Sequence, residues 1–99
     1  MEINKNTSGE SLTMEIVGRL DAATAPQLEK ELNASLTGVK SLIFDFSKLD
    51  YIASAGLRVL LVAQKRMNKQ GNMTIRNIKE DVKEVLEMTG FIDFLNIEG

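Results

Sequence analysis

The run from Leu42 to Leu61 constrains the fold more than any other stretch of the sequence. It opens with three consecutive apolar residues typical of a buried strand, continues through a short polar loop and ends in a strongly apolar helix. At the join between loop and helix stands the hydroxyl of Ser54, between alanines and a glycine. Small neighbours leave this hydroxyl open to a partner, and the helix start places it among backbone N–H groups that lack an intrahelical acceptor.

The rest of the chain repeats this alternation of strand and helix. Turn residues at Thr7–Glu10 join two opening strands and predict a hairpin. Apolar residues three or four positions apart, with helix-start and glycine-stop signals, predict three helices. The expected strands are Met1–Asn4, Leu12–Val17, Ser41–Phe46, Met73–Arg76 and Phe94–Ile97, and the expected helices run from a start at Thr24 to a stop at Gly38, from Ala55 to Lys69 and from Glu80 to Met88.

The order β-β-α-β-α-β-α-β predicts the fold class. It indicates a single α/β domain over residues 1–99, with an N-terminal hairpin, three main helices and a mixed, mostly parallel sheet with right-handed crossovers. Because Leu42-Ile43-Phe44 is continuously apolar, we expect that strand to be covered on both faces. Thr24 is the expected cap of the first helix, with Gln27 completing a capping box.

Composition excludes several classes of function. The 99 residues contain no Cys and no His, so disulfides, thiolate or imidazole metal sites and Ser-His catalysis are all excluded. The formal net charge of −2 argues against a nucleic-acid partner. No apolar run approaches the roughly 20 residues that a membrane-spanning helix needs, so we expect no membrane insertion and a cytoplasmic location. No cofactor or metal motif is present.

Polar residues follow the expected parallel strands, where functional groups gather in such sheets. Asp21, Asp45, Ser47 and Ser54 are therefore expected along one edge of the domain. Asp21 and Asp45 are each most simply turn formers, although as a pair they could act as general acid and base or bind magnesium. Arg19 and Arg58 are either solvated surface charges or cations that receive a phosphate or face acidic groups of a partner.

Ser54 itself has two compatible interpretations. Serine is a preferred N-cap, so the hydroxyl could simply accept a bond from the first turn of the next helix. The same hydroxyl could be a phosphoacceptor, because a phosphate adds about −1.5 to −2 charges at a helix start that favours anions.

Three segments of the chain resemble the STAS domains of bacterial anti-sigma factor antagonists. The central one is Asp45-Phe46-Ser47 followed by Tyr51-Ile52-Ala53-Ser54-Ala55-Gly56-Leu57. Gly18-Arg19-Leu20-Asp21 is similar to the family's Gly-x-Leu-Asp element, and Met88-Thr89-Gly90-Phe91 to the stretch after its third helix. The residue before the phosphoacceptor is commonly Asp in the family, whereas this chain has Ala53, so a charge beside the hydroxyl is missing.

This resemblance implies a protein-binding module rather than an enzyme. In the family the phosphoacceptor is a serine or threonine at the position of Ser54, the kinase is an anti-sigma factor of the GHKL ATPase type, and a PP2C-type phosphatase removes the phosphate. The unphosphorylated antagonist binds the anti-sigma factor and frees the sigma factor for transcription. The resemblance also implies a partner-binding surface that contains Asp21, Ala53, Ala55, Gly56, Leu57 and Arg58.

Two other functions fit the same fold. The chain could be a STAS subunit without a switch, in a lipid-transport ABC complex or a stressosome-like assembly. It could also bind a nucleotide or another small molecule at the ends of its strands.

Overall fold

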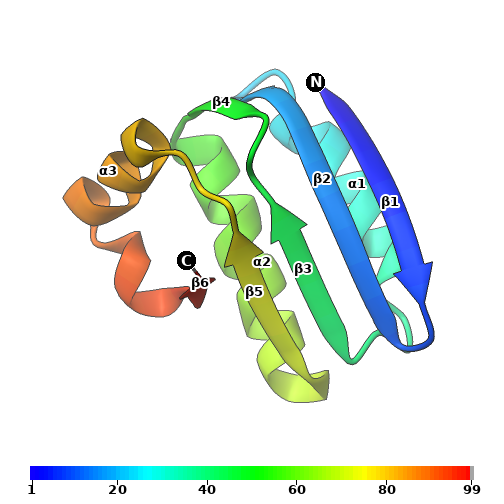
Figure 1. Ribbon diagram of the computed structural model, residues 1–99. Helices are drawn as coiled ribbons and strands as arrows, with labels where there is room; N and C mark the ends of the chain where they lie inside the picture. Colours follow the sequence, from blue (N-terminus) through cyan, green and yellow to red (C-terminus); the bar gives the residue numbers. More distant parts are fainter. Residues whose placement is uncertain (99) are drawn as a thin grey trace.

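The computed structural model describes residues 1–98 and confirms an α/β fold with an N-terminal hairpin and three helices (Figure 1). The elements are β1 (Glu2–Ser8), β2 (Ser11–Leu20), α1 (Ala25–Ser35), β3 (Ser41–Asp45), β4 (Leu49–Ile52), α2 (Ser54–Gln70), β5 (Asn72–Arg76), α3 (Glu80–Thr89), the short 3-10 helix η1 (Phe91–Phe94) and β6 (Ile97–Glu98).

The strands form one mixed sheet in the order β1-β2-β3-β5-β6. β1 pairs with β2 in the antiparallel direction through a turn in which Gly9 has a φ of 59°, a conformation that glycine adopts without strain. The β2–β3, β3–β5 and β5–β6 pairs are parallel. The prediction of a mostly parallel sheet after a hairpin is therefore confirmed.

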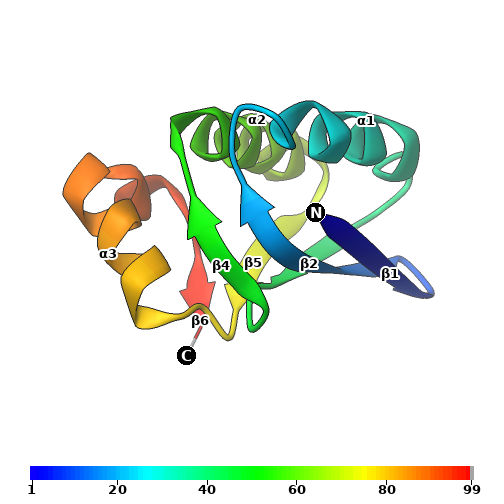
Figure 2. The ribbon, with the colours of Figure 1, turned by 90° about the horizontal axis from the view of Figure 1, so that it is seen from above.

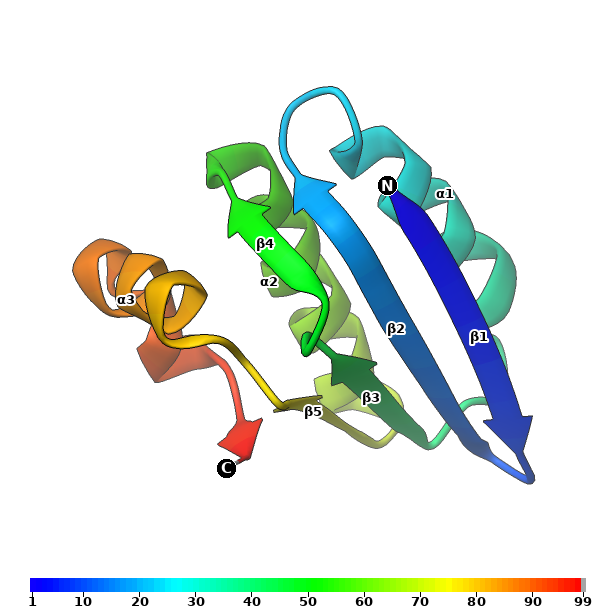
Figure 3. The same cartoon turned by 45° about the horizontal axis from the view of Figure 1, so that its top comes forward.

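β4 is a strand that the sequence did not indicate. It lies in the expected loop between β3 and α2, and it pairs in parallel with the last residues of β2 (Figure 3). β2 has ten residues and β3 only five, so β3 leaves the end of β2 unpaired and β4 takes its place. The strand escaped detection because it is four residues long and its two middle residues, Asp50 and Tyr51, are both exposed, which breaks the usual alternation.

Both long helices lie on one face of the sheet, as Figure 2 shows from above. Alternate residues of the central strands point toward these helices and form the core, among them Met14, Ile16, Leu42, Phe44 and Ile75. The opposite face carries the remaining residues, including Thr13, Glu15 and Ile43, which stay partly exposed. The expectation that β3 is covered on both faces is therefore wrong, because α3 packs beside β4 rather than across β3.

The C-terminal part differs from the prediction in its last element. Gly90 ends α3 in the left-handed conformation, with a φ of 79°, as expected for a glycine stop. The expected strand Phe94–Ile97 is wrong over most of its length, because η1 includes Phe94 and β6 covers only Ile97 and Glu98. Phe91 and Ile92 pack against the core, so their apolar side chains are used in a helical turn instead.

Candidate functional site

Ser54 is the first residue of α2, and Ala53 occupies the N-cap position with extended backbone angles. No side chain caps this helix, and within residues 1–98 the Ser54 hydroxyl makes no hydrogen bond. The side chain is exposed. The interpretation of Ser54 as a structural cap is therefore wrong: its hydroxyl faces solvent, and its neighbours are too small to cover it.

The backbone around Ser54 is held against the end of β2. The Ala53 N–H donates to the Leu20 carbonyl at 2.9 Å. Gly56 lies so close to the same residue that an added Cβ would be 2.5 Å from Leu20 Cγ and 3.1 Å from the Leu20 carbonyl oxygen. Because Leu20 is fully buried, only a glycine at position 56 lets α2 start this close to β2. The position of Ser54 is thus set by packing rather than by a cap.

The loop after β2 is organised by Asp21 and Thr24. Asp21 Oδ1 accepts bonds from the Ala23 and Thr24 N–H groups at 3.0 and 3.2 Å. The Thr24 hydroxyl donates to the Arg19 carbonyl at 2.8 Å and accepts from the Asp21 N–H at 2.9 Å. The predicted capping box is wrong, because this hydroxyl is used within the loop and the Gln27 amide donates to the Met1 carbonyl instead.

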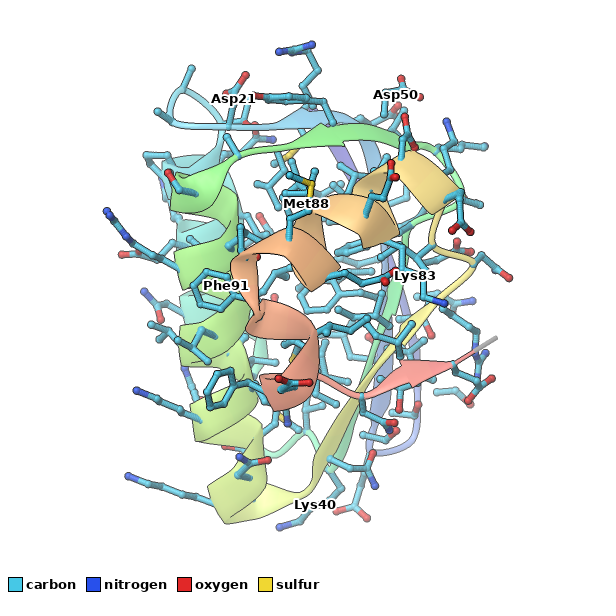
Figure 4. The ribbon with its side chains drawn as sticks, turned by 90° about the vertical axis from the view of Figure 1, so that its left-hand side faces the viewer. Asp21, Lys40, Asp50, Lys83, Met88 and Phe91 are labelled. Atoms are coloured by element: carbon cyan, nitrogen blue, oxygen red, sulfur yellow. The ribbon has the colours of Figure 1, made fainter. Side chains whose placement is uncertain are left out.

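The pKa of Asp21 lies below its ordinary value. Desolvation alone raises the pKa, but the N–H groups of Thr24 and Ala23, the Thr24 hydroxyl and the Arg19 guanidinium together outweigh it. The carboxylate therefore stays charged and holds a tight turn at the end of β2. Figure 4 shows Asp21 at the same end of the molecule as Asp50 and at the opposite end from Lys40.

Arg19 and Tyr51 form an exposed pair beside this turn. They face each other in the register of β2 and β4, and the Arg19 guanidinium lies 4.2 Å from the centre of the Tyr51 ring. Arg19 Nε is also 3.7 Å from Asp21 Oδ2. Tyr51 is 41% exposed, so the pair presents an aromatic surface with a cation held on it. No sequence pattern indicates this contact, because it depends on β4.

A groove of about 250 Å³ runs between α1 and α2, and its lining includes Ala55, the residue after Ser54. Its floor is made of small and apolar side chains, and Val62, which is 64% exposed, forms part of its wall. Glu29 and Arg58 contribute charges to the lining. The complete lining is Ala22, Ala25, Pro26, Glu29, Ala55, Arg58, Val59 and Val62. The groove and the Ser54 hydroxyl together make one accessible surface at this end of the molecule.

The STAS domain family model matches residues 2–99. This chain belongs to the STAS domain family. A curated relative is 39% identical over 82 residues, which are 81% of this chain and 71% of the relative; it is named "putative anti-sigma factor antagonist BtrV" and comes from Bordetella bronchiseptica.

Solved structures of SpoIIAA, an anti-sigma factor antagonist, share the fold of this STAS domain. The match to the unphosphorylated form has a TM-score of 0.83 at 17% identity, and it covers 99% of this chain and 89% of the SpoIIAA chain. The match to the phosphorylated form from Bacillus has a TM-score of 0.75 at 16% identity, and it covers 99% of this chain and 92% of that SpoIIAA chain.

The residues that the sequence singled out in this STAS domain do not all lie together. Ser54 and Asp21 lie at the same end, because each is next to a residue of the Ala53–Leu20 hydrogen bond, and Ala55 and Arg58 line the groove there. Gly56 and Leu57 face the core, and with Leu57 only 1% exposed a partner cannot reach its side chain.

Asp45 lies far from Asp21 and Ser54. It pairs in register with Glu15, six residues before Asp21, which puts the two aspartates ~20 Å apart along β2. Its Oδ1 accepts bonds from the Ser47 N–H at 3.0 Å and the Asn77 side chain at 3.4 Å. Burial raises the pKa of Asp45, and these bonds outweigh that effect and lower it. The prediction that Asp45 and Ser47 lie on the same edge as Asp21 and Ser54 is therefore wrong. The alternative in which Asp21 and Asp45 act together as general acid and base or bind magnesium is wrong for the same reason.

Within residues 1–98 there is no cluster of three or more acidic side chains that could hold a metal ion. No helix of this region combines the length and apolar character needed to cross a bilayer.

Proposed function

We propose that this STAS domain is an anti-sigma factor antagonist that is switched by phosphorylation of Ser54. The observation that carries the proposal is the Ser54 hydroxyl itself, which is exposed, unbonded within residues 1–98 and placed at the first residue of α2. The name of the BtrV relative supports the role, and the two SpoIIAA structures show that this fold exists in phosphorylated and unphosphorylated forms.

In this proposal the partner is an anti-sigma factor that docks on the surface around Ser54. The Asp21 turn, Ala53, Ala55 and Arg58 form that surface, and Gly56 and Leu57 support it from beneath. A phosphate on Ser54 would bring about −1.5 to −2 charges into the contact, which costs several kcal/mol unless the partner supplies a cation. Each 1.4 kcal/mol reduces affinity tenfold, so one phosphate is enough to abolish binding.

The enzymes that act on Ser54 come from outside the chain. The sequence contains neither His nor Cys, so a Ser-His pair or a cysteine nucleophile cannot form, and in this proposal the hydroxyl serves as a substrate of another protein's active site. We propose a GHKL-type kinase activity in the anti-sigma factor and a PP2C-type phosphatase that reverses the modification.

Incubation with the GHKL-type anti-sigma factor and ATP tests the phosphoacceptor. Intact mass and site mapping are expected to place one phosphate on Ser54 and none on the Ser54→Ala variant. The control is Ser47→Ala, which removes another exposed hydroxyl and should leave phosphorylation unchanged. Phosphate on the Ser54→Ala protein would contradict the assignment.

The switch itself is tested by titrating the partner into wild type and Ser54→Glu in a calorimeter. We expect the glutamate variant to bind at least tenfold more weakly, while its thermal midpoint stays within about 2 °C of wild type, because the hydroxyl makes no bond that the fold needs. Equal affinity would disprove the switch. A large loss of thermal stability would instead show that Ser54 has a structural role.

A further inference from the structure

Ser54 and Arg58 lie one helical turn apart on the same face of α2. Residues four apart on a helix have Cβ atoms about 5–6 Å from each other, and an anion that precedes a cation by four residues is the favourable order. Arg58 is exposed, and within residues 1–98 it takes part in no ion pair or side-chain hydrogen bond. Its guanidinium is therefore available to a group attached to Ser54.

The structure separates Arg58 from the other arginine at this end. Arg19 is already held between the Asp21 carboxylate and the Tyr51 ring, and it would have to leave both to reach a new anion. Arg58 has no competing anion on its own helix start, because the first turn of α2 contains no acidic residue. Glu29 lines the same groove, but within residues 1–98 it forms no ion pair with either arginine.

We propose that Arg58 binds the phosphate of phosphorylated Ser54 within α2. The proposal rests on the proposed function, because it requires that Ser54 is modified. The planar guanidinium can donate two parallel bonds to phosphate oxygens, which a lysine at this position could not do. The pairing holds the phosphate on α2 and at the same time engages the Arg58 guanidinium, which otherwise lines the groove. Phosphorylation thus changes two positions of the docking surface together.

The test uses protein with phosphoserine incorporated genetically at position 54, in wild type, Arg58→Gln and Arg66→Gln. The phosphate pKa, ordinarily about 6, is measured by phosphorus NMR during a pH titration. A paired guanidinium favours the dianion, so we expect a phosphate pKa about half a unit lower in wild type than in Arg58→Gln. Arg19, Asp21, Glu29 and the Asp50–Lys79 ion pair, which also carry charge at this end, are present in all three proteins, so the difference isolates Arg58.

Arg66→Gln is the matched control because it removes the same charge from the same helix. Arg66 lies 12 residues after Ser54, ~18 Å along the helix axis and beyond the ~10 Å screening length at 0.1 M salt. The phosphate on Ser54 should therefore have the same pKa in the Arg66→Gln protein as in wild type. A phosphate pKa in Arg58→Gln equal to wild type, or an equal rise in both variants, would overturn the proposal.

A second measurement distinguishes the Arg58–phosphate pairing from an effect of the substitutions on folding. The thermal midpoint is compared with and without phosphoserine in each background. Phosphoserine should raise the midpoint in wild type and Arg66→Gln by more than in Arg58→Gln, whereas the same change in all three would contradict the pairing. Because the phosphate is introduced without a kinase, this outcome is independent of whether a kinase modifies Ser54, and the two proposals can fail separately.

Discussion

Asp21 shows how one side chain can organise the approach to the candidate site. Its carboxylate holds the Ala23 and Thr24 N–H groups with Oδ1 and faces Arg19 with Oδ2. These contacts favour the charged form and lower the pKa of Asp21 below its ordinary 3.8. A carboxyl group whose pKa is lowered by folding stabilises the protein above its unfolded pKa and loses that contribution as the pH falls through the folded pKa.

The Asp21→Asn variant should therefore lose stability at neutral pH but not in acid. Asparagine keeps the Oδ1 acceptor of the turn and removes only the charge. We expect wild type to be the more stable protein at pH 7, with the difference shrinking toward about pH 3 as Asp21 itself becomes protonated. Urea denaturation across this range measures the difference, and a gap that does not change with pH would refute the argument. Asp93→Asn, which removes an exposed charge, controls for net charge.

At the scale of the element, α2 is fastened at both ends by contacts with other parts of the chain. Its start is set by the close approach of Gly56 to Leu20. Its end is set by Gln70, whose amide nitrogen donates to the Leu36 and Val39 carbonyls, both at 2.7 Å. These two carbonyls follow α1, so the Gln70 side chain joins the ends of the two long helices.

Replacing Gln70 with alanine should destabilise the protein by about 1–3 kcal/mol, because the partly buried Val39 carbonyl loses its donor and the Leu36 carbonyl keeps only the bond from the Val39 N–H. Gln27→Ala is the matched control: its amide also donates to a backbone carbonyl, that of Met1, but in an exposed position. We expect it to cost less than about 1 kcal/mol. Denaturant unfolding gives both values, and similar costs for the two variants would show that burial of these carbonyls is not decisive.

At the scale of the whole molecule, the C-terminal part is attached less firmly than the rest. α3 contributes only Val82 and Leu86 to the fully buried core, η1 contributes no fully buried residue, and β6 pairs with β5 over two positions. Met88 and Phe94 are 84% and 63% exposed, while Phe91 turns toward α2 (Figure 4). The central strands and α2, in contrast, supply most of the buried side chains.

Hydrogen exchange under native conditions should reveal this difference. Amides of α3 and β6 are expected to exchange through local opening, at least tenfold faster than the most protected amides of β2, β3 and α2, because few apolar contacts hold them. Exchange measured by NMR, residue by residue, tests the order. Equal protection across all these elements would indicate that the molecule opens only as a single unit.

Local patterns were sufficient for much of this architecture. The hairpin, three helices and parallel strands follow from apolar periodicity, turn residues and glycine stops such as Gly90, all of which act over a few neighbouring positions. The resemblance around Ser54 likewise lies in consecutive residues, and the family membership that it suggested is confirmed. Among the inferences that failed were those about hydroxyl partners: the Thr24 hydroxyl is bonded within the loop after β2, and the Ser54 hydroxyl has no partner within residues 1–98.

The sequence by itself determined the fold class, the element order and the presence of one hydroxyl among small neighbours at a strand-to-helix join. Only the tertiary structure decided that β4 completes β2, that Arg19 lies on Tyr51 beside the Asp21 turn, and that Asp45 is remote from both. The physical reason is strand register. Which side chains meet at a sheet edge depends on hydrogen bonds between residues far apart in the chain, and no local pattern encodes them. Ser54 is therefore recognisable from its neighbours in sequence, whereas the surface around it exists only once β2, β4 and α2 have come together.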